Sequence, residues 1–154
     1  MKITVIGGGP GGLYFSILTK KAMPSCEIDV YEQNKPDDSF GFGVVFSDET
    51  LGEFLTRDTE SYELIRSKFA YWDDIALHFK GQRLVSSGHG FCGIGRKKLL
   101  MLLQQRAQDL GVDLRYETEV DSAEAYRSDY DVVVANDASI SYKRDRKKCF
   151  NIRY

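Results

Sequence analysis

The sequence predicts an α/β fold in which a central parallel sheet is accompanied by a small antiparallel meander. Three features predict it: an apolar run at residues 2–6 that stops at glycine, apolar residues at helical spacing over residues 11–21, and an alternating strand at residues 27–32. A strand, a helix and a strand within about thirty residues form a right-handed βαβ unit. With 154 residues, of which 42% are hydrophobic, the chain can bury one ordinary core.

The elements of this first unit follow from local patterns. Residues 2–6 are mostly β-branched and apolar, which is typical of a buried parallel strand. In the following segment Leu13 and Ile17 lie on one helical face, and Pro24 marks the end of the helix. Val30 lies between charged or polar neighbours in the second strand, as expected for alternation.

The middle of the chain predicts a loop, helices and a hairpin. Residues 33–47 are rich in Asp, Gly and Phe and have no helical period, so they are expected to form a long loop. Residues 50–69 can hold one or two helices. Residues 71–85 alternate as a hairpin that turns at residues 80–82.

Three further elements are expected after this hairpin. Residues 96–110 place Leu103 and other apolar residues on one helical face, and Gly111 follows in the C′ position. Residues 112–115 and 130–135 are predicted strands. The second of these contains three consecutive valines and is therefore expected to be central in the sheet.

Composition argues against several function classes. The chain is 29% charged, and no apolar run approaches the roughly 18–20 residues that a membrane span requires, so no membrane contact is expected. Its three cysteines are odd in number and far apart, which argues against a disulfide framework or a zinc site. Glycine follows the short apolar start where a signal peptide needs a longer apolar segment, so a cytoplasmic protein is expected.

The charge distribution sets a boundary near the C-terminus. Residues 142–154 carry six basic residues and one acidic residue. We expect residues 1–141 to form one domain and residues 142–154 to be a basic tail. A solvated tail is favoured over a nucleic-acid contact, because charge runs at chain ends are commonly solvent-exposed, so no nucleic-acid partner is expected.

The glycine-rich turn after the first strand is the strongest functional motif. Its sequence is Gly7-Gly8-Gly9-Pro10-Gly11-Gly12. A pyrophosphate needs backbone N–H groups aimed at it, no Cβ in the way and the positive end of a helix, and this turn supplies all three. We therefore expect Gly7, Gly9, Pro10, Gly11 and Gly12 to bind a dinucleotide, which makes the domain Rossmann-like and FAD- or NAD(P)-binding.

Glu32 lies 20 residues after Gly12, at the end of the second predicted strand. A carboxylate in this position accepts hydrogen bonds from both ribose hydroxyls of an adenosine and repels a 2′-phosphate, which disfavours NADP in this pocket. The same ADP half occurs in FAD and NAD. These residues therefore leave the choice between the two cofactors open.

Three segments carry a resemblance to a known family. They are residues 1–14, the pair Tyr31-Glu32, and residues 41–47 with the sequence Gly-Phe-Gly-Val-Val-Phe-Ser. Together they resemble the N-terminal part of the class A flavoprotein aromatic monooxygenases. The third segment is the most specific, and it is most similar to the salicylyl-CoA 5-hydroxylase and 2-aminobenzoyl-CoA monooxygenase group.

The resemblance implies that the chain binds FAD as part of a monooxygenase that hydroxylates a small aromatic substrate, a CoA thioester in this group, with NAD(P)H and O₂. It also implies that Gly43 and Val44 lie along the flavin and that Arg96 reaches the cofactor from a helix start. An arginine in a first helical turn faces an unfavourable dipole unless an anion such as phosphate is near. Asp137 matches the family's Asp-Gly motif, although Ala138 stands where the family has glycine.

The resemblance covers only the first part of a typical family member, so the fold is expected to be incomplete relative to that family. Two alternatives stay open: a non-catalytic, truncated dinucleotide-binding remnant, and an NAD-linked oxidoreductase. No catalytic side chain can be named. Exposed edges of an incomplete sheet favour self-association.

The remaining polar and aromatic clusters favour structural roles. His78 and His89 match no metal-ligand spacing, so no metal site is expected. Phe69, Tyr71, Trp72 and Phe79 form an aromatic cluster at strand spacing, where aromatic side chains commonly belong to the core.

Overall fold

The computed structural model describes residues 1–136 and 149–151, except for the side chains of residues 48, 49 and 149–151. The chain divides into two compact units. The first unit comprises Met1–Ser39 and Leu100–Tyr154, and the second comprises Phe40–Leu99.

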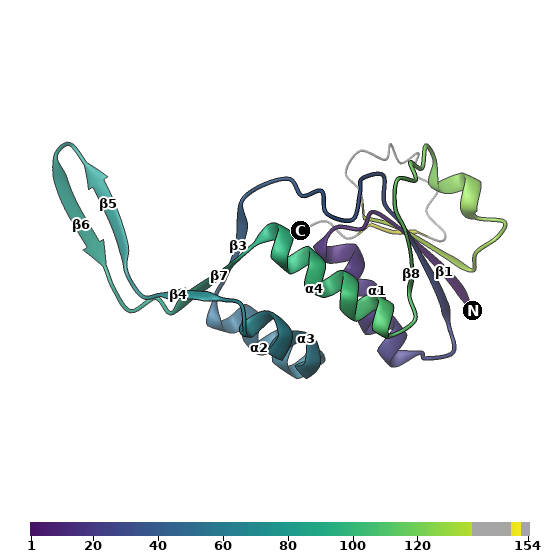
Figure 1. Ribbon diagram of the computed structural model, residues 1–154, viewed down its shortest axis with the longest axis horizontal. Coiled ribbons are helices and arrows are strands. Elements are labelled where there is room, and N and C mark those ends of the chain that lie inside the picture. The colour runs from purple at the N-terminus through teal and green to yellow at the C-terminus, as the bar shows by residue number, and fades with distance from the viewer. Residues whose placement is uncertain (137–148, 152–154) are drawn as a thin grey trace. The chain divides into compact units, whose positions relative to one another are not determined.

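The first unit is built on a five-stranded parallel sheet with the order β10-β9-β1-β2-β8 (Figure 1). Its strands are β1 (Lys2–Ile6), β2 (Glu27–Tyr31), β8 (Asp113–Arg115), β9 (Val132–Ala135) and β10 (Cys149–Asn151). Parallel pairing of β1 and β2 requires a crossover, which the helix α1 (Pro10–Ala22) supplies. The predicted βαβ unit is therefore confirmed.

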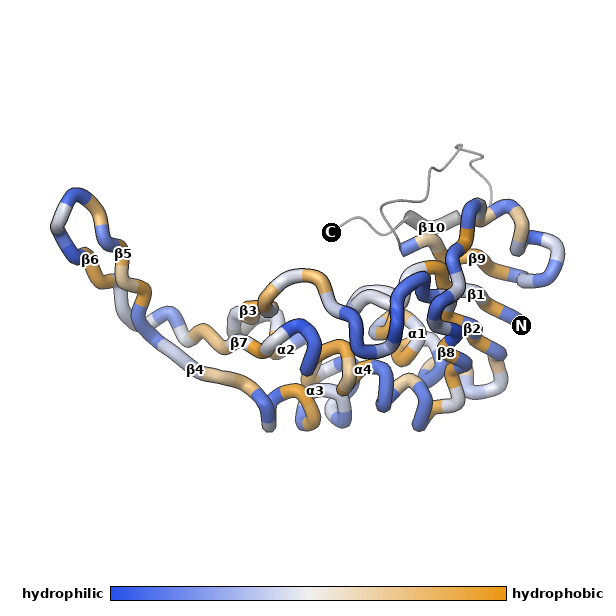
Figure 2. The backbone as a smooth tube through the Cα atoms, turned by 45° about the horizontal axis from the view of Figure 1, so that its top comes forward, coloured by the Kyte–Doolittle hydropathy of each residue, from blue (hydrophilic) through white to orange (hydrophobic). Residues whose placement is uncertain are grey.

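One face of this sheet is apolar because alternate residues of its central strands are apolar. Val5 of β1 and Val30 of β2 are fully buried at paired register positions. The helix α1 and the part of α4 (Arg96–Asp109) that belongs to this unit lie on the same side of the sheet (Figures 1 and 2). They bury Ile17 and Leu103, which are at most 1% exposed.

The opposite face of the sheet is covered by the chain between β8 and β9, which includes the 3₁₀ helix η1 (Ala123–Tyr126). Ile6, Tyr31, Ala123, Tyr130 and Val133 form a buried cluster there. The apolar side chains of this connection thus cover the second face of the sheet, as two-faced burial of parallel sheets requires.

A polar network lies within this second face. The Tyr130 hydroxyl donates to Oδ2 of the buried Asp29 and lies 3.0 Å from the Tyr31 hydroxyl, and Arg115 Nη1 donates to Tyr31 Oη at 2.9 Å. Arg115 Nη2 also lies 3.4 Å from Asp29 Oδ1. Burial and the hydrogen bond to Asp29 raise the pKa of Tyr130, which keeps its hydroxyl protonated. The network fixes the connection between β8 and β9 against β2.

The second unit contains a three-stranded antiparallel sheet, a helix pair and a hairpin. The sheet has the order β3 (Gly43–Phe46), β7 (Phe91–Gly95), β4 (Ala70–Trp72). The helices are α2 (Asp48–Arg57) and α3 (Thr59–Arg66). The hairpin joins β5 (Ile75–Phe79) to β6 (Gln82–Ser86).

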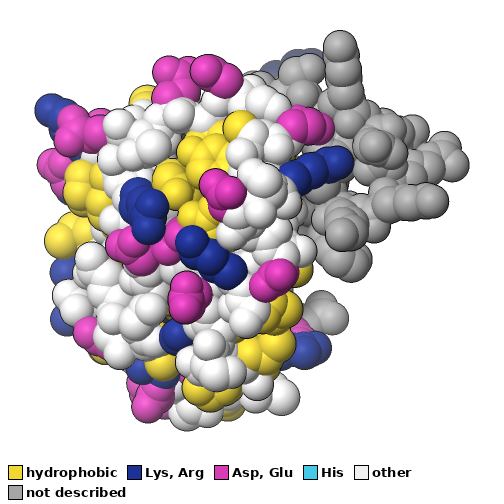
Figure 3. Space-filling model, turned by 90° about the vertical axis from the view of Figure 1, so that its right-hand side faces the viewer, with side chains coloured by type: hydrophobic (Ala, Val, Ile, Leu, Met, Phe, Trp, Pro, Cys, Tyr) yellow, Lys and Arg dark blue, Asp and Glu magenta, His cyan; other side chains and the backbone are white. Residues whose placement is uncertain are grey.

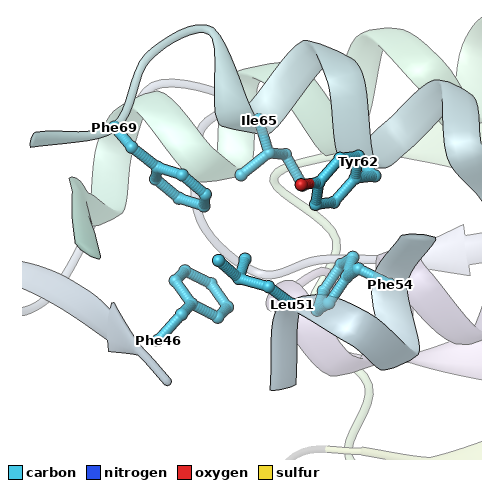
Figure 4. Close-up of a pocket in the computed structure, with 6 residues that line it drawn as sticks. All are labelled: Phe46, Leu51, Phe54, Tyr62, Ile65 and Phe69. Carbon is cyan, nitrogen blue, oxygen red and sulfur yellow. The ribbon is translucent and has the colours of Figure 1, made fainter. Parts of the chain in front are cut away.

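Apolar side chains pack between β3 and the two helices (Figure 4). The Phe46 ring lies 5.8 Å from the Phe54 ring, edge to face, and 5.4 Å from the Phe69 ring. Leu51, Tyr62 and Ile65 complete the lining of this cluster. Ile65 is 3% exposed, so the cluster is the core of the second unit.

The expected fold class is confirmed, and the main differences lie in short strands. Residues 71–85 were expected to form one hairpin, but β4 pairs with β7 and only β5 and β6 form the hairpin. β3 falls within the segment expected to be a loop, β7 was not expected, and β10 lies within the segment expected to be a basic tail. β3 and β7 contain three glycines in nine residues, and glycine weakens a strand signal. The valine-rich β9 is an inner strand beside β1, which occupies the central position.

The hairpin turn is confirmed at Lys80 and Gly81, whose φ angles of 48° and 76° fit a two-residue type I′ turn. The expectation that Tyr71 and Phe79 are core residues is wrong, because they are 63% and 59% exposed. Aromatic residues at strand spacing require a covering layer, and β4 and β5 present these side chains to solvent in the described structure. Within the part of the chain that is described, no helix is long and apolar enough to cross a membrane.

Candidate functional site

The glycine turn connects β1 to α1 in the first unit. Gly7 has a φ of 107°, which an L side chain rarely adopts, and its N–H donates to Tyr31 O at 2.8 Å. Gly9 is the N-cap of α1, and Pro10 occupies the first helical turn. The N-cap residue thus has no side chain to satisfy the N–H groups of the helix start, which remain directed at any anion bound there.

Two glycines of the turn have different spatial roles. A Cβ on Gly12 would lie 2.1 Å from Gly7 O, so the start of α1 approaches the end of β1 too closely for any side chain. A Cβ on Gly9 would meet none of the described heavy atoms within 4 Å. Gly12 therefore serves helix–strand packing, and Gly9 faces an open space.

Glu32 is held beside this turn by three hydrogen bonds. Its Oε2 accepts from Gly8 N at 2.8 Å, and its Oε1 accepts from Asn34 N at 2.9 Å and from Asn34 Nδ2 at 2.6 Å. A Cβ on Gly8 would lie only 3.0 Å from Glu32 Cβ, so a side chain there would press against Glu32. The predicted proximity of Glu32 to the glycine turn is thus present in the structure.

The loop after β8 forms a wall beside Glu32 that the sequence did not predict. Thr118 N donates to Glu32 O at 3.0 Å, and Glu117 N donates to Asn34 O at 3.2 Å. Burial, together with the negative charge of Glu32, raises the pKa of Tyr116 to about 12. The position of this loop directly after a predicted strand could have indicated it, because ligands of open α/β sheets bind at the carboxyl ends of the strands.

Asn136 is a second residue that the sequence did not single out. It follows β9, and its N–H donates to Ile6 O at 2.8 Å. Its Nδ2 lies 3.3 Å from the position of a Cβ on Gly12, which places an amide donor next to the glycine turn. Asn136 therefore adds a polar group at the same edge of the sheet as Glu32.

The second unit brings three other predicted residues together. Arg96 N donates to Phe42 O at 3.2 Å, and Arg96 Cδ lies 3.7 Å from the position of a Cβ on Gly41. In the adjacent strands Gly43 pairs with Gly95, next to Val44. The Arg96 side chain thus passes along the glycine-containing segment that precedes β3.

The predicted site residues consequently form two groups, one in each unit. Asp137 belongs to neither, because it lies outside the described residues. The two histidines lie at the hairpin: His78 is in β5, and His89 lies after β6, where its Nε2 is 2.7 Å from Ser86 Oγ.

Comparison with known proteins agrees with this geometry. No family model matches the chain. Over 142 residues, or 92% of its length, the chain is 45% identical to a salicyloyl-CoA 5-hydroxylase from a Streptomyces species. The predicted resemblance to the flavoprotein aromatic monooxygenases is confirmed. The chain spans 27% of the length of that relative.

Solved structures show the same fold. The tetrameric form of 2-methyl-3-hydroxypyridine-5-carboxylic acid oxygenase matches 88% of the chain and 39% of its own chain, with a TM-score of 0.74 at 19% identity. The structure of CtdE in complex with FAD matches 89% of the chain and 37% of its own chain, with a TM-score of 0.65 at 18% identity. The chain therefore has the fold of one part of these larger proteins.

Proposed function

We propose that the chain is the FAD-binding portion of a flavoprotein monooxygenase that hydroxylates an aromatic CoA thioester with NAD(P)H and O₂. The main support for this proposal is an open glycine turn beside Glu32, in a chain that is 45% identical over 142 residues to a salicyloyl-CoA 5-hydroxylase. FAD supplies redox chemistry that amino-acid side chains lack. The residues of this chain bind and orient it.

The glycine turn binds the pyrophosphate of the cofactor in this proposal. The open side of Gly9 admits the phosphate oxygens to the backbone N–H groups. The first turn of α1 contains no acidic residue, so the helix itself places no negative charge at its positive end. Asn136 Nδ2, next to the turn, is positioned as a further donor.

Glu32 holds the adenosine ribose. A carboxylate oxygen has about two lone-pair sites, and Oε2 accepts one bond from Gly8, so it can accept another from a ribose hydroxyl. The same oxygen repels a 2′-phosphate. The hydrogen bonds to Asn34 fix the carboxylate before the ligand arrives, which lowers the entropic cost of binding.

Gly43, Val44 and Arg96 contact the rest of the cofactor in this proposal. Arg96 begins α4 and is followed by two lysines, an arrangement opposed by the helix dipole unless an anion is bound. Its guanidinium is suited to bidentate contact with a phosphate. Asp137 stays a proposed contact on the strength of the family motif alone. No side chain of the chain is assigned to a catalytic step.

The partners and location remain proposals. Self-association through sheet edges is opposed at β8, which is three residues long and carries Asp113 and Arg115, since short charged edge strands resist pairing. Figure 3 shows acidic and basic side chains interspersed on the face that it presents. Size-exclusion chromatography with light scattering tests self-association. A cytoplasmic location is tested by cell fractionation.

Ligand titration by calorimetry tests the proposal directly. ADP is expected to bind through the half that it shares with FAD, and FAD is expected to bind more tightly because Gly43, Val44 and Arg96 contact the rest of the cofactor. ADP with an added 2′-phosphate binds at least about tenfold more weakly than ADP, or ~1.4 kcal/mol. The variant Glu32→Gln reduces that discrimination because it removes the negative charge. Equal binding of the two nucleotides to the wild-type chain contradicts the assignment of Glu32.

A separate comparison distinguishes FAD from NAD. A flavin absorbance band that persists after FAD is added and the protein is desalted supports the flavoprotein assignment. Retention of NAD⁺ in preference to FAD supports the NAD-linked alternative instead. Because the ADP half is shared, binding of ADP alone does not separate these two outcomes.

A further inference from the structure

The carboxylate of Glu32 has few hydrogen-bonding sites left for a ligand. An ionised carboxylate offers about two acceptor sites on each of its oxygens. Oε1 already accepts two bonds, from Asn34 N at 2.9 Å and from Asn34 Nδ2 at 2.6 Å. Oε2 accepts one bond, from Gly8 N at 2.8 Å. Counted over the described residues, Oε1 is therefore fully used, and one acceptor site is left on Oε2.

Asn34 is held in this position by contacts on two sides. Of the polar atoms of its side-chain amide, only Nδ2 can donate to a carboxylate, so Glu32 determines how the amide is turned. The backbone oxygen of Asn34 accepts from Glu117 N at 3.2 Å, in the loop after β8. The residue is also partly buried. The contact between Asn34 and Oε1 is thus part of the folded site and exists before a ligand binds.

A ribose bound at Glu32 meets two carboxylate oxygens of unequal capacity. The two hydroxyls of an adenosine ribose are on adjacent carbons, so a carboxylate with a free site on each oxygen can accept from both of them. A hydroxyl that bonds to Oε1 of Glu32 must first displace the Asn34 amide. It would then exchange one charge-assisted hydrogen bond for another, without net gain. Oε2 is therefore the oxygen that remains available to the ribose.

We propose that Asn34 is a positioning residue that restricts Glu32 to a single ribose hydroxyl, the 2′-hydroxyl. An acidic residue at the end of the second strand bonds the 2′-hydroxyl in dinucleotide-binding folds of this type. The 3′-hydroxyl makes no bond to Glu32, because Asn34 occupies the oxygen that would accept it. This inference rests on the proposed function, since it requires an adenosine ribose at Glu32.

The total affinity for a nucleotide does not reveal this role, but the ratio between nucleotides does. Removal of the Asn34 amide loosens the carboxylate, which weakens binding. It also frees a site on Oε1 for the 3′-hydroxyl, which strengthens binding. A purely structural role of Asn34 changes the affinity for all adenine nucleotides alike. A role in restricting Glu32 changes how strongly each hydroxyl contributes.

Calorimetric titration of the wild-type chain with ADP, 2′-deoxy-ADP and 3′-deoxy-ADP is the first test. The 2′-deoxy nucleotide is expected to bind at least about tenfold more weakly than ADP, because it lacks the bond to a charged acceptor. The 3′-deoxy nucleotide is expected to bind within about twofold of ADP. Equal weakening by the two deoxy nucleotides overturns the inference, and this measurement needs no variant to fold.

The variant Asn34→Ala is the second test. With the amide removed, 3′-deoxy-ADP is expected to bind at least about fivefold more weakly than ADP, because Oε1 then accepts the 3′-hydroxyl. Gln33→Ala is the matched control. It removes the neighbouring carboxamide, which is exposed and which none of the described hydrogen bonds joins to Glu32, so the wild-type ratios are expected. Circular dichroism checks that both variants fold.

The outcomes separate this inference from the proposed function. A wild-type chain that binds none of the three nucleotides refutes the nucleotide site itself, and the role of Asn34 with it. If ADP binds and Asn34→Ala keeps the wild-type ratios, the nucleotide site stands and the role of Asn34 is overturned. The same holds if Gln33→Ala changes the ratios as much as Asn34→Ala does, because the effect is then not specific to the contact with Oε1.

Discussion

Substituting the two glycines Gly9 and Gly12 separates cofactor binding from folding. In Gly12→Ala the new Cβ starts 2.1 Å from Gly7 O, and ordinary contact begins at 3.4 Å, so the groups must separate by 3.4 − 2.1 = 1.3 Å. Both sides of this contact are backbone, which cannot turn away as a side chain can. Overpacking costs typically ~1–3 kcal/mol, and we expect the upper end of that range here.

Gly9→Ala, by contrast, is expected to change the stability of the fold little. Gly9 has a φ of −70°, which alanine adopts without strain, and its Cβ meets none of the described heavy atoms within 4 Å. The expected loss of stability is below about 1 kcal/mol, the difference between glycine and alanine at an N-cap. Gly9→Val places a larger group in the space assigned to the pyrophosphate, so FAD or ADP affinity is expected to fall at least about tenfold.

Thermal melting and calorimetry measure the two effects. Near this chain length ~1 kcal/mol shifts the melting temperature by about 2–4 °C, so Gly12→Ala lowers it by roughly 6–12 °C and Gly9→Ala by less than about 4 °C. The reasoning is refuted if Gly12→Ala melts with the wild type. It is equally refuted if Gly9→Val binds ADP with unchanged affinity.

Four further substitutions probe the described contacts. The pKa of Tyr116 is raised from 10.0 to about 12, so the fold favours the neutral hydroxyl and stability falls as pH rises from 10 to 12. Tyr116→Phe is expected to reduce this loss of stability by about 1 kcal/mol, after allowance for the partial exposure of the side chain. Urea midpoints measured from pH 10 to pH 12 check this. Gly52→Ala in α2 is expected to raise the melting temperature by the equivalent of about 1 kcal/mol, because the new Cβ meets no described atom within 4 Å and alanine favours a helix. Gly81→Ala is expected to lower it by a similar amount, because φ is +76° there. Asp29→Asn removes a buried charge from its contacts with Tyr130 and Arg115, and denaturation is expected to show a loss of about 3 kcal/mol; an unchanged midpoint contradicts a stabilising role for this network.

The sequence predicted the first unit well because its signals are local. The glycines, the helix after them and Glu32 all lie within residues 7–32, and local spacing determines their arrangement. The strands β3 and β7 were not predicted because their signals are not local. Their pairing joins Val44 to Ile94, which are 50 residues apart, and only tertiary contact stabilises strands that contain so many glycines.

The walls of the candidate site were missed for a related reason. Thr118 and Asn136 contact the Glu32 and Gly12 regions through the order of strands in the sheet, and no spacing along the chain encodes that order. The order β9-β1-β2-β8 brings the carboxyl ends of four strands together, so the residues that follow each strand become neighbours. The sequence motif therefore identifies the glycine turn, and the strand order identifies the residues that surround it.

The polar network explains why the wall beside Glu32 keeps its position. Arg115 is the last residue of β8, and its side chain contacts Asp29 and Tyr31 while its carbonyl accepts from Glu32 N at 2.9 Å. The same residue thus connects the buried network to the proposed ribose site. Asp29 touches no part of that site, and yet Asp29→Asn is expected to loosen the loop that begins at Tyr116. A fall in ADP affinity alongside the loss of stability would show that the sheet interior helps to order the ribose site.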